Sequence, residues 1–173
     1  GTVLGLLNLF SALIADGDTV VVATPCYQSL EELPRSLGAR VLPWRWRVVD
    51  GRWVLDVDEL ASLAAGARMI VLNLPHNPTG ALVSRNDFDA IVAIARHEGA
   101  ILLVDEVYRE LEREPEERLS AACDAYERGV SLGVLSKNAG LAGLRIGWLA
   151  TRDAGILDAV ARVKELNPGA VYC

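Results

Sequence analysis

Short, unbroken apolar runs recur along this chain, and segments with helical spacing of apolar residues separate them. The four clearest runs cover residues 19–23, 69–72, 101–104 and 130–135. A strand whose residues do not alternate between apolar and polar is buried on both faces, as in a parallel sheet covered by helices. The pattern therefore predicts an α/β fold with a mainly parallel sheet and helices on both faces.

Helical segments fill the intervals between these runs. Apolar residues spaced by three and four predict helices over residues 3–15, 28–37, 56–65, 88–97 and 153–166. Asp56 is a candidate N-cap, and Ser84 with Asp87 three residues later has the form of a capping box. Gly99 is placed to end the helix that follows Ser84.

Two further segments are less regular. Residues 40–48 alternate apolar side chains with arginines and contain a proline, which is typical of an edge strand. We expect Trp44, Trp46 and Trp53 to pack against the sheet. Residues 110–118 are densely charged, and we expect them to face solvent.

A last strand is predicted over residues 144–150. It follows the run at residues 130–135 after an interval too short for a crossover helix. Parallel neighbours need a connection of about a dozen residues or more, usually helical. One of these two strands is therefore expected to be antiparallel.

Length and charge narrow the class of protein. The chain has 173 residues, of which 51% are hydrophobic, enough for one domain with a substantial core. It begins at Gly1 without a methionine and stops at Cys173 just after a helical pattern, so we expect a piece of a longer protein. The net charge of −6 disfavours nucleic acid or an anionic membrane surface as a partner. No apolar run approaches the roughly 18 residues of a membrane span.

The cysteines and histidines exclude further classes. Cys26, Cys123 and Cys173 are odd in number and widely spaced. This predicts free thiols in a reducing compartment, and hence a cytoplasmic location, rather than a disulfide framework. His76 and His97, the only histidines, are too isolated for a histidine-based metal site.

Polar and turn-forming residues gather where the apolar runs end. Successive runs lead into residues 25–27, 73–80, 105–108 and 136–145. In open α/β sheets, ligands bind beyond the carboxyl ends of the strands. These four segments are therefore expected to meet at one edge and to form the candidate site.

Each candidate residue also has an ordinary explanation. Asp105 after a strand is most often a helix cap, and Tyr27 after a proline is commonly a packing residue. Arg145 and Lys137 would be surface charges by default. Lys137 is nevertheless unusual, because the chain has two lysines against fifteen arginines. Unlike a guanidinium, an amine can lose its proton and attack a carbonyl carbon.

Taken together and in order, three motifs resemble the class I/II aminotransferases, fold-type I enzymes that use pyridoxal 5′-phosphate. The motifs are Asn-Leu-Pro-His-Asn-Pro-Thr-Gly at residues 73–80, Asp-Glu-Val-Tyr at 105–108, and Ser-Lys at 136–137 followed by Arg-Ile-Gly-Trp at 145–148. The resemblance covers nearly the whole chain. It implies that residues 1–173 are the cofactor-binding large domain, without the N-terminal segment and the C-terminal small domain of the family.

The resemblance implies roles for the residues around the cofactor ring. Lys137 would form a Schiff base with the cofactor aldehyde and, once freed, would move the proton at the substrate α-carbon. Asp105 would keep the pyridine nitrogen protonated. Tyr108 and Asn77 would hydrogen-bond the ring 3′-oxygen. Tyr27 would stack on the ring.

By the same resemblance, Arg145 would bind the cofactor phosphate with a bidentate fork. Gly1 and Thr2, at the start of the first helix, would add donors to that phosphate. Ser136 is a further phosphate candidate, because the serine that many relatives carry three positions before the lysine is Val134 here.

The loops around these residues carry two further expectations. The resemblance also implies that the peptide bonds before Pro25 and Pro78 are cis, which would direct Tyr27 and Asn77 toward the cofactor. His76, beside Asn77, has two open interpretations: a substrate contact, or a loop histidine with no role.

The implied activity is transfer of an amino group between an amino acid and a 2-oxo acid, by a homodimer of the full-length protein that has no nucleic-acid or membrane partner. A lyase, decarboxylase or cyclising enzyme that uses the same cofactor is the nearest alternative, because identical contacts would serve it. An aminotransferase-like ligand-sensing domain of a regulator is the other. We expect this piece alone to lack the family's carboxylate-binding arginine, and hence to be inactive by itself.

Overall fold

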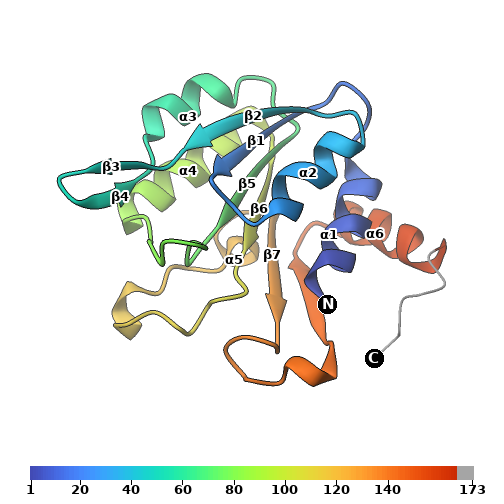
Figure 1. Cartoon of the computed structure of the whole chain (residues 1–173). Coiled ribbons are helices and arrows are strands. Elements are labelled where there is room, and N and C mark those ends of the chain that lie inside the picture. Colours follow the sequence, from blue (N-terminus) through green and yellow to red (C-terminus); the bar gives the residue numbers. More distant parts are fainter. Residues whose placement is uncertain (167–173) are drawn as a thin grey trace.

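A mixed, mainly parallel sheet organises the fold (Figure 1). The structure, a computed structural model, describes residues 1–166. The sheet has six strands in the order β2-β1-β5-β6-β7-β8. Their bounds are β1 (Thr19–Thr24), β2 (Arg40–Arg45), β5 (Met69–Asn73), β6 (Ile101–Asp105), β7 (Gly129–Val134) and β8 (Gly147–Thr151). All neighbours pair in parallel except β7 and β8, so the predicted fold class and its antiparallel strand are confirmed.

Helices cover both faces of this sheet (Figure 1). They are α1 (Thr2–Leu13), α2 (Gln28–Ser36), α3 (Val57–Leu63), α4 (Arg85–Glu98), α5 (Ala122–Ala125) and α6 (Ala154–Leu166). One core cluster lies under α3 and α4, and the other lies under α1, α2 and α6. Within β1, Val21 belongs to the first cluster, whereas Val20 and Val22 belong to the second. Burial on both faces explains why the strands are apolar without alternation.

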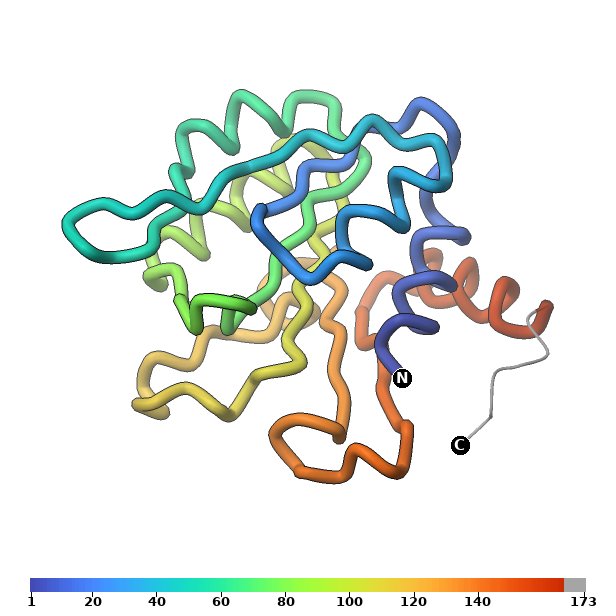
Figure 2. The backbone as a smooth tube through the Cα atoms, in the orientation of Figure 1, coloured from blue at the N-terminus to red at the C-terminus, as the bar shows by residue number. Residues whose placement is uncertain are grey.

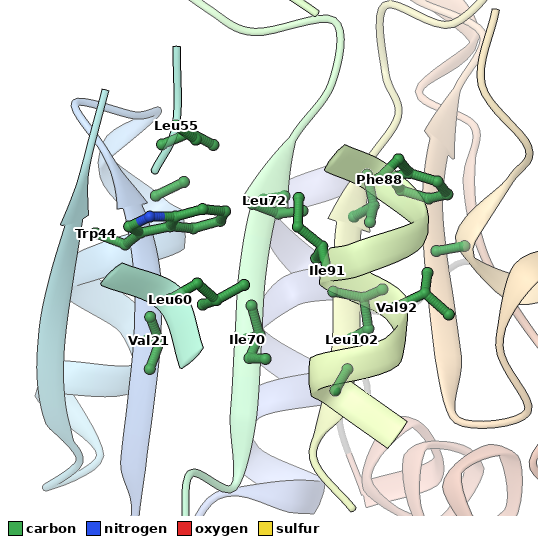
Figure 3. Close-up of a cluster of buried hydrophobic side chains, with 14 of the residues drawn as sticks. Val21, Trp44, Leu55, Leu60, Ile70, Leu72, Phe88, Ile91, Val92 and Leu102 are labelled. Atoms are coloured by element: carbon green, nitrogen blue, oxygen red, sulfur yellow. The ribbon is translucent and has the colours of Figure 1, made fainter. Parts of the chain in front are cut away.

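The core under α3 and α4 is shown in Figure 3. Trp44 of β2, Leu60 of α3 and Ile91 of α4 are all fully buried there. Burying a large apolar side chain contributes roughly 1.5–3 kcal/mol relative to leaving it exposed. The Trp44 indole Nε1 donates to the Asp56 carbonyl at 2.8 Å, so its burial leaves that donor satisfied.

Capping chemistry sets the ends of α3 and α4 as predicted. The Asp56 carboxylate accepts hydrogen bonds from the backbone N–H groups of Asp58 at 3.0 Å and Glu59 at 3.1 Å. The Ser84 hydroxyl caps α4 by accepting from the Asp87 amide at 3.1 Å. Gly99 ends α4 in the left-handed conformation with φ 64°, which a residue without Cβ adopts readily.

The expectation of a single strand over residues 40–48 was wrong, because the structure divides this segment between two strands. β2 ends at Arg45, which pairs with Thr24 at the end of β1, and the Trp46 amide makes a further hydrogen bond to the Thr24 carbonyl at 2.8 Å. The chain then turns at residues 50–51, forming a separate hairpin of β3 (Arg47–Val49) and β4 (Arg52–Val54). Asp50 and Gly51 both have positive φ, at 49° and 75°, as a two-residue hairpin turn with an Asp-Gly sequence requires.

Two expectations about exposure were wrong in part. Trp44 and Trp46 are buried as expected, but Trp53 lies on the hairpin and is 39% exposed. Most of the charged segment at residues 110–118 is exposed, yet the Glu112 side chain is only 3% exposed. An ion pair with Arg118 at 3.2 Å accounts for that burial.

β7 and β8 approach each other unusually closely. Gly133 pairs with Trp148, and a Cβ atom on Gly133 would lie 2.3 Å from Cε2 of that indole. Only glycine fits there without displacing the tryptophan. β8 begins at Gly147 rather than at residue 144, because residues 142–144 form a 3₁₀ turn instead of extended backbone.

Among residues 1–166, no helix is both long and apolar enough to cross a bilayer. Cys26 and Cys123 are free thiols, as predicted. Cys173 lies outside the described residues.

Candidate active site

All nine predicted site residues line one cavity of about 690 Å³. It opens at the carboxyl ends of β1, β5, β6 and β7, where α/β sheets bind ligands. A volume of this size suits a small-molecule site, for which roughly 300–1,000 Å³ is usual. The lining includes Gly1, Thr2, Tyr27, Asn77, Asp105, Tyr108, Ser136, Lys137 and Arg145.

Asp105 is the buried acid of the cavity. It ends β6, and its residue is 4% exposed. Burial raises its pKa to about 7, and the neighbouring charge of Glu106 adds to that rise. A hydrogen bond from the Val107 amide at 3.2 Å and the positive charge of Lys137 act in the opposite direction. The site therefore holds a carboxylate with an unusually strong affinity for a proton.

Lys137 lies on the exposed connection between β7 and β8. Its Nζ is 5.3 Å from the centroid of the Tyr108 ring, within the range of a cation–π contact. Lys137 and Asp105 thus share one cavity, with Tyr108 beside the amine.

Asn73, which our sequence analysis did not assign to the site, joins two of its walls. Its Nδ2 donates to the Asp105 carbonyl oxygen at 2.8 Å, and its Oδ1 accepts from the Asn77 amide at 2.6 Å. Asn73 is 2% exposed and pairs with Asp105 in the sheet register. The available signal was an amide side chain at the last residue of a buried strand.

The start of α1 and Arg145 form a cationic end of the cavity. Gly1 caps α1 without a side-chain hydrogen bond, and the first turn holds no acidic residue, so its N–H groups are available to an anion. The Gly1 backbone nitrogen donates to the Arg145 carbonyl at 3.3 Å. A Cβ on Gly1 would lie 3.0 Å from Nη2 of Arg145, which makes this a close approach. Figure 2 shows the N-terminus beside the segment that leads into β8.

The remaining predicted features fall around the rim. Tyr27 precedes α2 and is 46% exposed. The bonds before Pro25 and Pro78 are cis as predicted, and so is the bond before Pro75, which was not foreseen. Ser136 is half-buried beside Lys137.

His76 does not line this cavity. It is 2% exposed, lies beneath the loop that carries Asn77, and borders a second cavity of about 730 Å³ that shares Asn77 and Tyr108 with the first. Within residues 1–166, no group of three or more His, Cys, Asp or Glu side chains is arranged to hold a metal ion.

The structure thus places a lysine amine, a buried carboxylate and a cationic end in one cavity at the carboxyl edge of a mainly parallel sheet, a set of groups that suits an anionic small molecule. The chain belongs to the aminotransferase class I and II family, whose model matches residues 1–169.

Individual relatives agree with this membership. The chain is 38% identical to capreomycidine synthase of Streptomyces vinaceus, over 86% of this chain and 38% of that protein. It is 32% identical to an arginine–pyruvate transaminase of Pseudomonas aeruginosa, over 86% of this chain and 38% of the relative. A solved PLP-dependent aminotransferase from Streptococcus suis superposes with a TM-score of 0.88 at 34% identity, covering 96% of this chain and 43% of that one. The chain thus spans well under half the length of these relatives.

Proposed function

We propose that this chain is the cofactor-binding large domain of a pyridoxal-phosphate-dependent aminotransferase, which moves an amino group between an amino acid and a 2-oxo acid. One observation carries the proposal. The Lys137 amine, the Asp105 carboxylate and the cationic end near Arg145 line a single cavity. Family membership and the transaminase relatives support the same reaction.

The groups in the cavity fit the proposed cofactor. Lys137 offers an amine to an aldehyde, and Asp105 offers a carboxylate to a ring nitrogen. Arg145 and the free N–H groups at the start of α1 suit a phosphate dianion. When bound, pyridoxal phosphate supplies an electron-withdrawing ring that takes up the electron pair released at the substrate α-carbon.

The chain's own residues then have distinct tasks. Lys137, as a free amine, would take the proton from the substrate α-carbon and deliver it to the C4′ position of the cofactor. Asp105 holds a proton on the ring nitrogen, and its raised proton affinity comes from burial.

The other residues of the cavity bind and orient. Tyr108 and Asn77 donate to the ring 3′-oxygen, and Tyr27 covers one ring face. Ser136 and Thr2 add hydroxyl donors beside Arg145 at the phosphate end.

A second candidate is a different reaction with the same cofactor. The relative named capreomycidine synthase favours it, because its name is not that of a transaminase. The contacts named above would serve either reaction, since the cofactor handles the electrons.

Absorption spectroscopy of the protein with added pyridoxal phosphate tests the cofactor assignment. We expect a new band near the visible range that Lys137→Ala abolishes. An unchanged cofactor spectrum in the wild type would refute the proposal. Product analysis with and without a 2-oxo acid then separates the two reactions, because only transamination requires that acceptor.

We also propose that the full-length protein is a cytoplasmic homodimer. Exposed apolar side chains near the cavity support a subunit interface, namely Val3, Leu7, Leu141, Leu144 and Trp148. The free thiols Cys26 and Cys123 support a reducing compartment. Light scattering of the full-length protein and fractionation of cells test these two statements.

A further inference from the structure

His76 lies where two loops of the site meet. Its Nε2 is 2.7 Å from the Pro25 carbonyl oxygen, and its Nδ1 is 2.7 Å from the Thr79 hydroxyl oxygen. Its ring stacks on Trp46, with centroids 4.6 Å apart and an interplanar angle of 28°. The ring is therefore held at both nitrogens and on one face.

The partners of the two ring nitrogens select one tautomer. A carbonyl oxygen only accepts, so Nε2 must carry a hydrogen to bond Pro25. The Thr79 hydroxyl accepts from the Ala81 amide at 3.2 Å, and it can donate its own hydrogen to Nδ1. A neutral ring protonated at Nε2 satisfies every group in this chain of bonds. Burial lowers the pKa of His76, which favours the same neutral form.

This chain of bonds joins segments that the sheet itself does not connect. The pairing of β1 with β5 ends at Val22 and Val71. Beyond it, the β1 end leads to Tyr27 and the β5 end leads to Asn77, and both of these line the cavity. The His76 side chain links the two loops past the last paired residues.

We propose that His76 is a positioning residue that, protonated at Nε2, sets the spacing between Tyr27 and Asn77 across the cavity. The inference rests on the proposed function, in which Tyr27 covers the cofactor ring and Asn77 bonds its 3′-oxygen. Without the His76 side chain, no hydrogen bond from this residue holds the two loops at a fixed spacing. The contacts of Tyr27 and Asn77 with the cofactor should then weaken together.

Nitrogen-15 NMR of the histidine rings tests the tautomer without any cofactor. The sequence contains two histidines, so a His97→Gln variant assigns both sets of signals. His97 is a suitable reference because its side chain is 85% exposed and lies away from both cavities. We expect a protonated Nε2 and an unprotonated Nδ1 for His76 at neutral pH. A ring protonated at Nδ1, or at both nitrogens, would overturn the inference whether or not the protein binds pyridoxal phosphate.

Three variants test the positioning role with pyridoxal phosphate as the probe. His76→Leu removes both bonds, and we expect the Kd for pyridoxal phosphate to rise by about tenfold, as loss of one to two hydrogen bonds implies. Thr79→Val removes the bond to Nδ1 and the acceptor of the Ala81 amide but keeps the bond to Pro25, and an intermediate rise of about threefold is expected. His76→Gln retains a donor for the Pro25 carbonyl and should restore most of the affinity.

Spectroscopy separates positioning from general stability. We expect the absorption maximum of bound pyridoxal phosphate and its pH midpoint to shift in His76→Leu and to return toward wild type in His76→Gln. His97→Leu should change neither. Equal affinity and equal spectra in all the His76 and Thr79 variants would overturn the positioning role. If His76→Leu does not fold, Thr79→Val and His76→Gln decide the question. A wild type that binds no cofactor would instead refute the proposed function and leave the NMR result standing.

Discussion

The two walls of the cavity are held in place by different means. The buried wall consists of Asn73 and Asp105 at the ends of β5 and β6, which are 2% and 4% exposed. The open wall is the β7–β8 connection, residues 135–146, where Lys137 and Arg145 are both exposed. Cross-strand hydrogen bonds fix the buried wall. The open wall is anchored in the sheet at its two ends, and between them the Asn138 Nδ2 donates to the exposed Glu110 carboxylate at 3.0 Å.

Because of this difference, substitutions in the two walls should have different effects on folding and on the reaction. In the buried wall, the sheet register positions the acid before a ligand arrives, so a substitution disturbs folding and chemistry together. In the open wall, solvated cations lose side-chain freedom when they bind a ligand. A substitution there should alter binding or chemistry and leave folding nearly unchanged.

Lys137→Ala is expected to have the largest effect and to sharpen the contrast. In the full-length protein, amino transfer should fall by at least about 10³-fold, a loss on the scale of general acid–base catalysis. The free energy of unfolding should change by less than about 0.5 kcal/mol, because the side chain is exposed. Steady-state kinetics and urea denaturation measure the two quantities.

The matched control is Lys164→Ala, the only other lysine, on α6. It should retain wild-type activity. If the Lys137→Ala variant kept its activity, Lys137 would have no part in the proposed reaction.

In the full-length protein, Asp105→Asn should lower amino transfer by about 10²–10³-fold, because a preorganised charge opposite the ring is lost. It also tests stability without cofactor. Burial raises the pKa of Asp105 from 3.8 to about 7, so between these values the folded state keeps a proton that the unfolded state releases. This stabilisation is complete below the unfolded pKa and is lost as pH rises through the folded one.

Relative to the Asn variant, the wild type should therefore lose up to about 4 kcal/mol of stability between about pH 4 and pH 8. Urea denaturation across that range, without added pyridoxal phosphate, measures the difference. Parallel stability profiles for the two proteins would show that Asp105 is not a strained buried acid.

Asn73→Ala should destabilise the protein by roughly 1–3 kcal/mol, since it leaves the Asn77 backbone amide without its partner and removes one of the two donors to the Asp105 carbonyl, the other being the Leu74 amide. Asn138→Ala, an amide in the open wall, is the matched control and should cost less than about 1 kcal/mol. Thermal and urea denaturation compare them. If the two variants lost the same free energy of unfolding, the proposed difference in structural sensitivity between the two walls would be wrong.

Arg145→Lys is expected to have the smallest effect. It keeps the charge but loses the fork, so the Kd for pyridoxal phosphate should rise about tenfold with little change in stability. Arg152→Lys, an exposed arginine paired with Asp124, should leave the Kd unchanged. Titration followed by absorption gives both values.

Features governed by neighbouring residues could be predicted from the sequence. The caps at Asp56 and Ser84 and the end at Gly99 depend on local chemistry alone, and all were foreseen. The small hairpin was missed although Asp50-Gly51 is a recognised turn signal, because its strands are three residues long and carry no periodicity.

The site was predictable in outline and not in its supporting bonds. The rule that ligands bind at strand ends brought distant motifs, such as residues 73–80 and 136–145, to one cavity. The role of Asn73 depends on the register between β5 and β6, and that of His76 depends on the paths of two loops. Neither is encoded in a local pattern.

The close contact between Gly133 and Trp148 has a consequence for how the chain length can vary. Because Val134 pairs with Gly147, the sheet fixes the two ends of the β7–β8 connection next to each other. A residue inserted in the middle of the connection, between 138 and 144, would leave Lys137 and Arg145 at the same short distances along the chain from the paired residues Val134 and Gly147. The same insertion between 134 and 137 would shift the Lys137 amine relative to Asp105 in the cavity that both residues line. The connection can therefore vary in length between residues 138 and 144, but not between residues 134 and 137, if the cavity is to keep its arrangement.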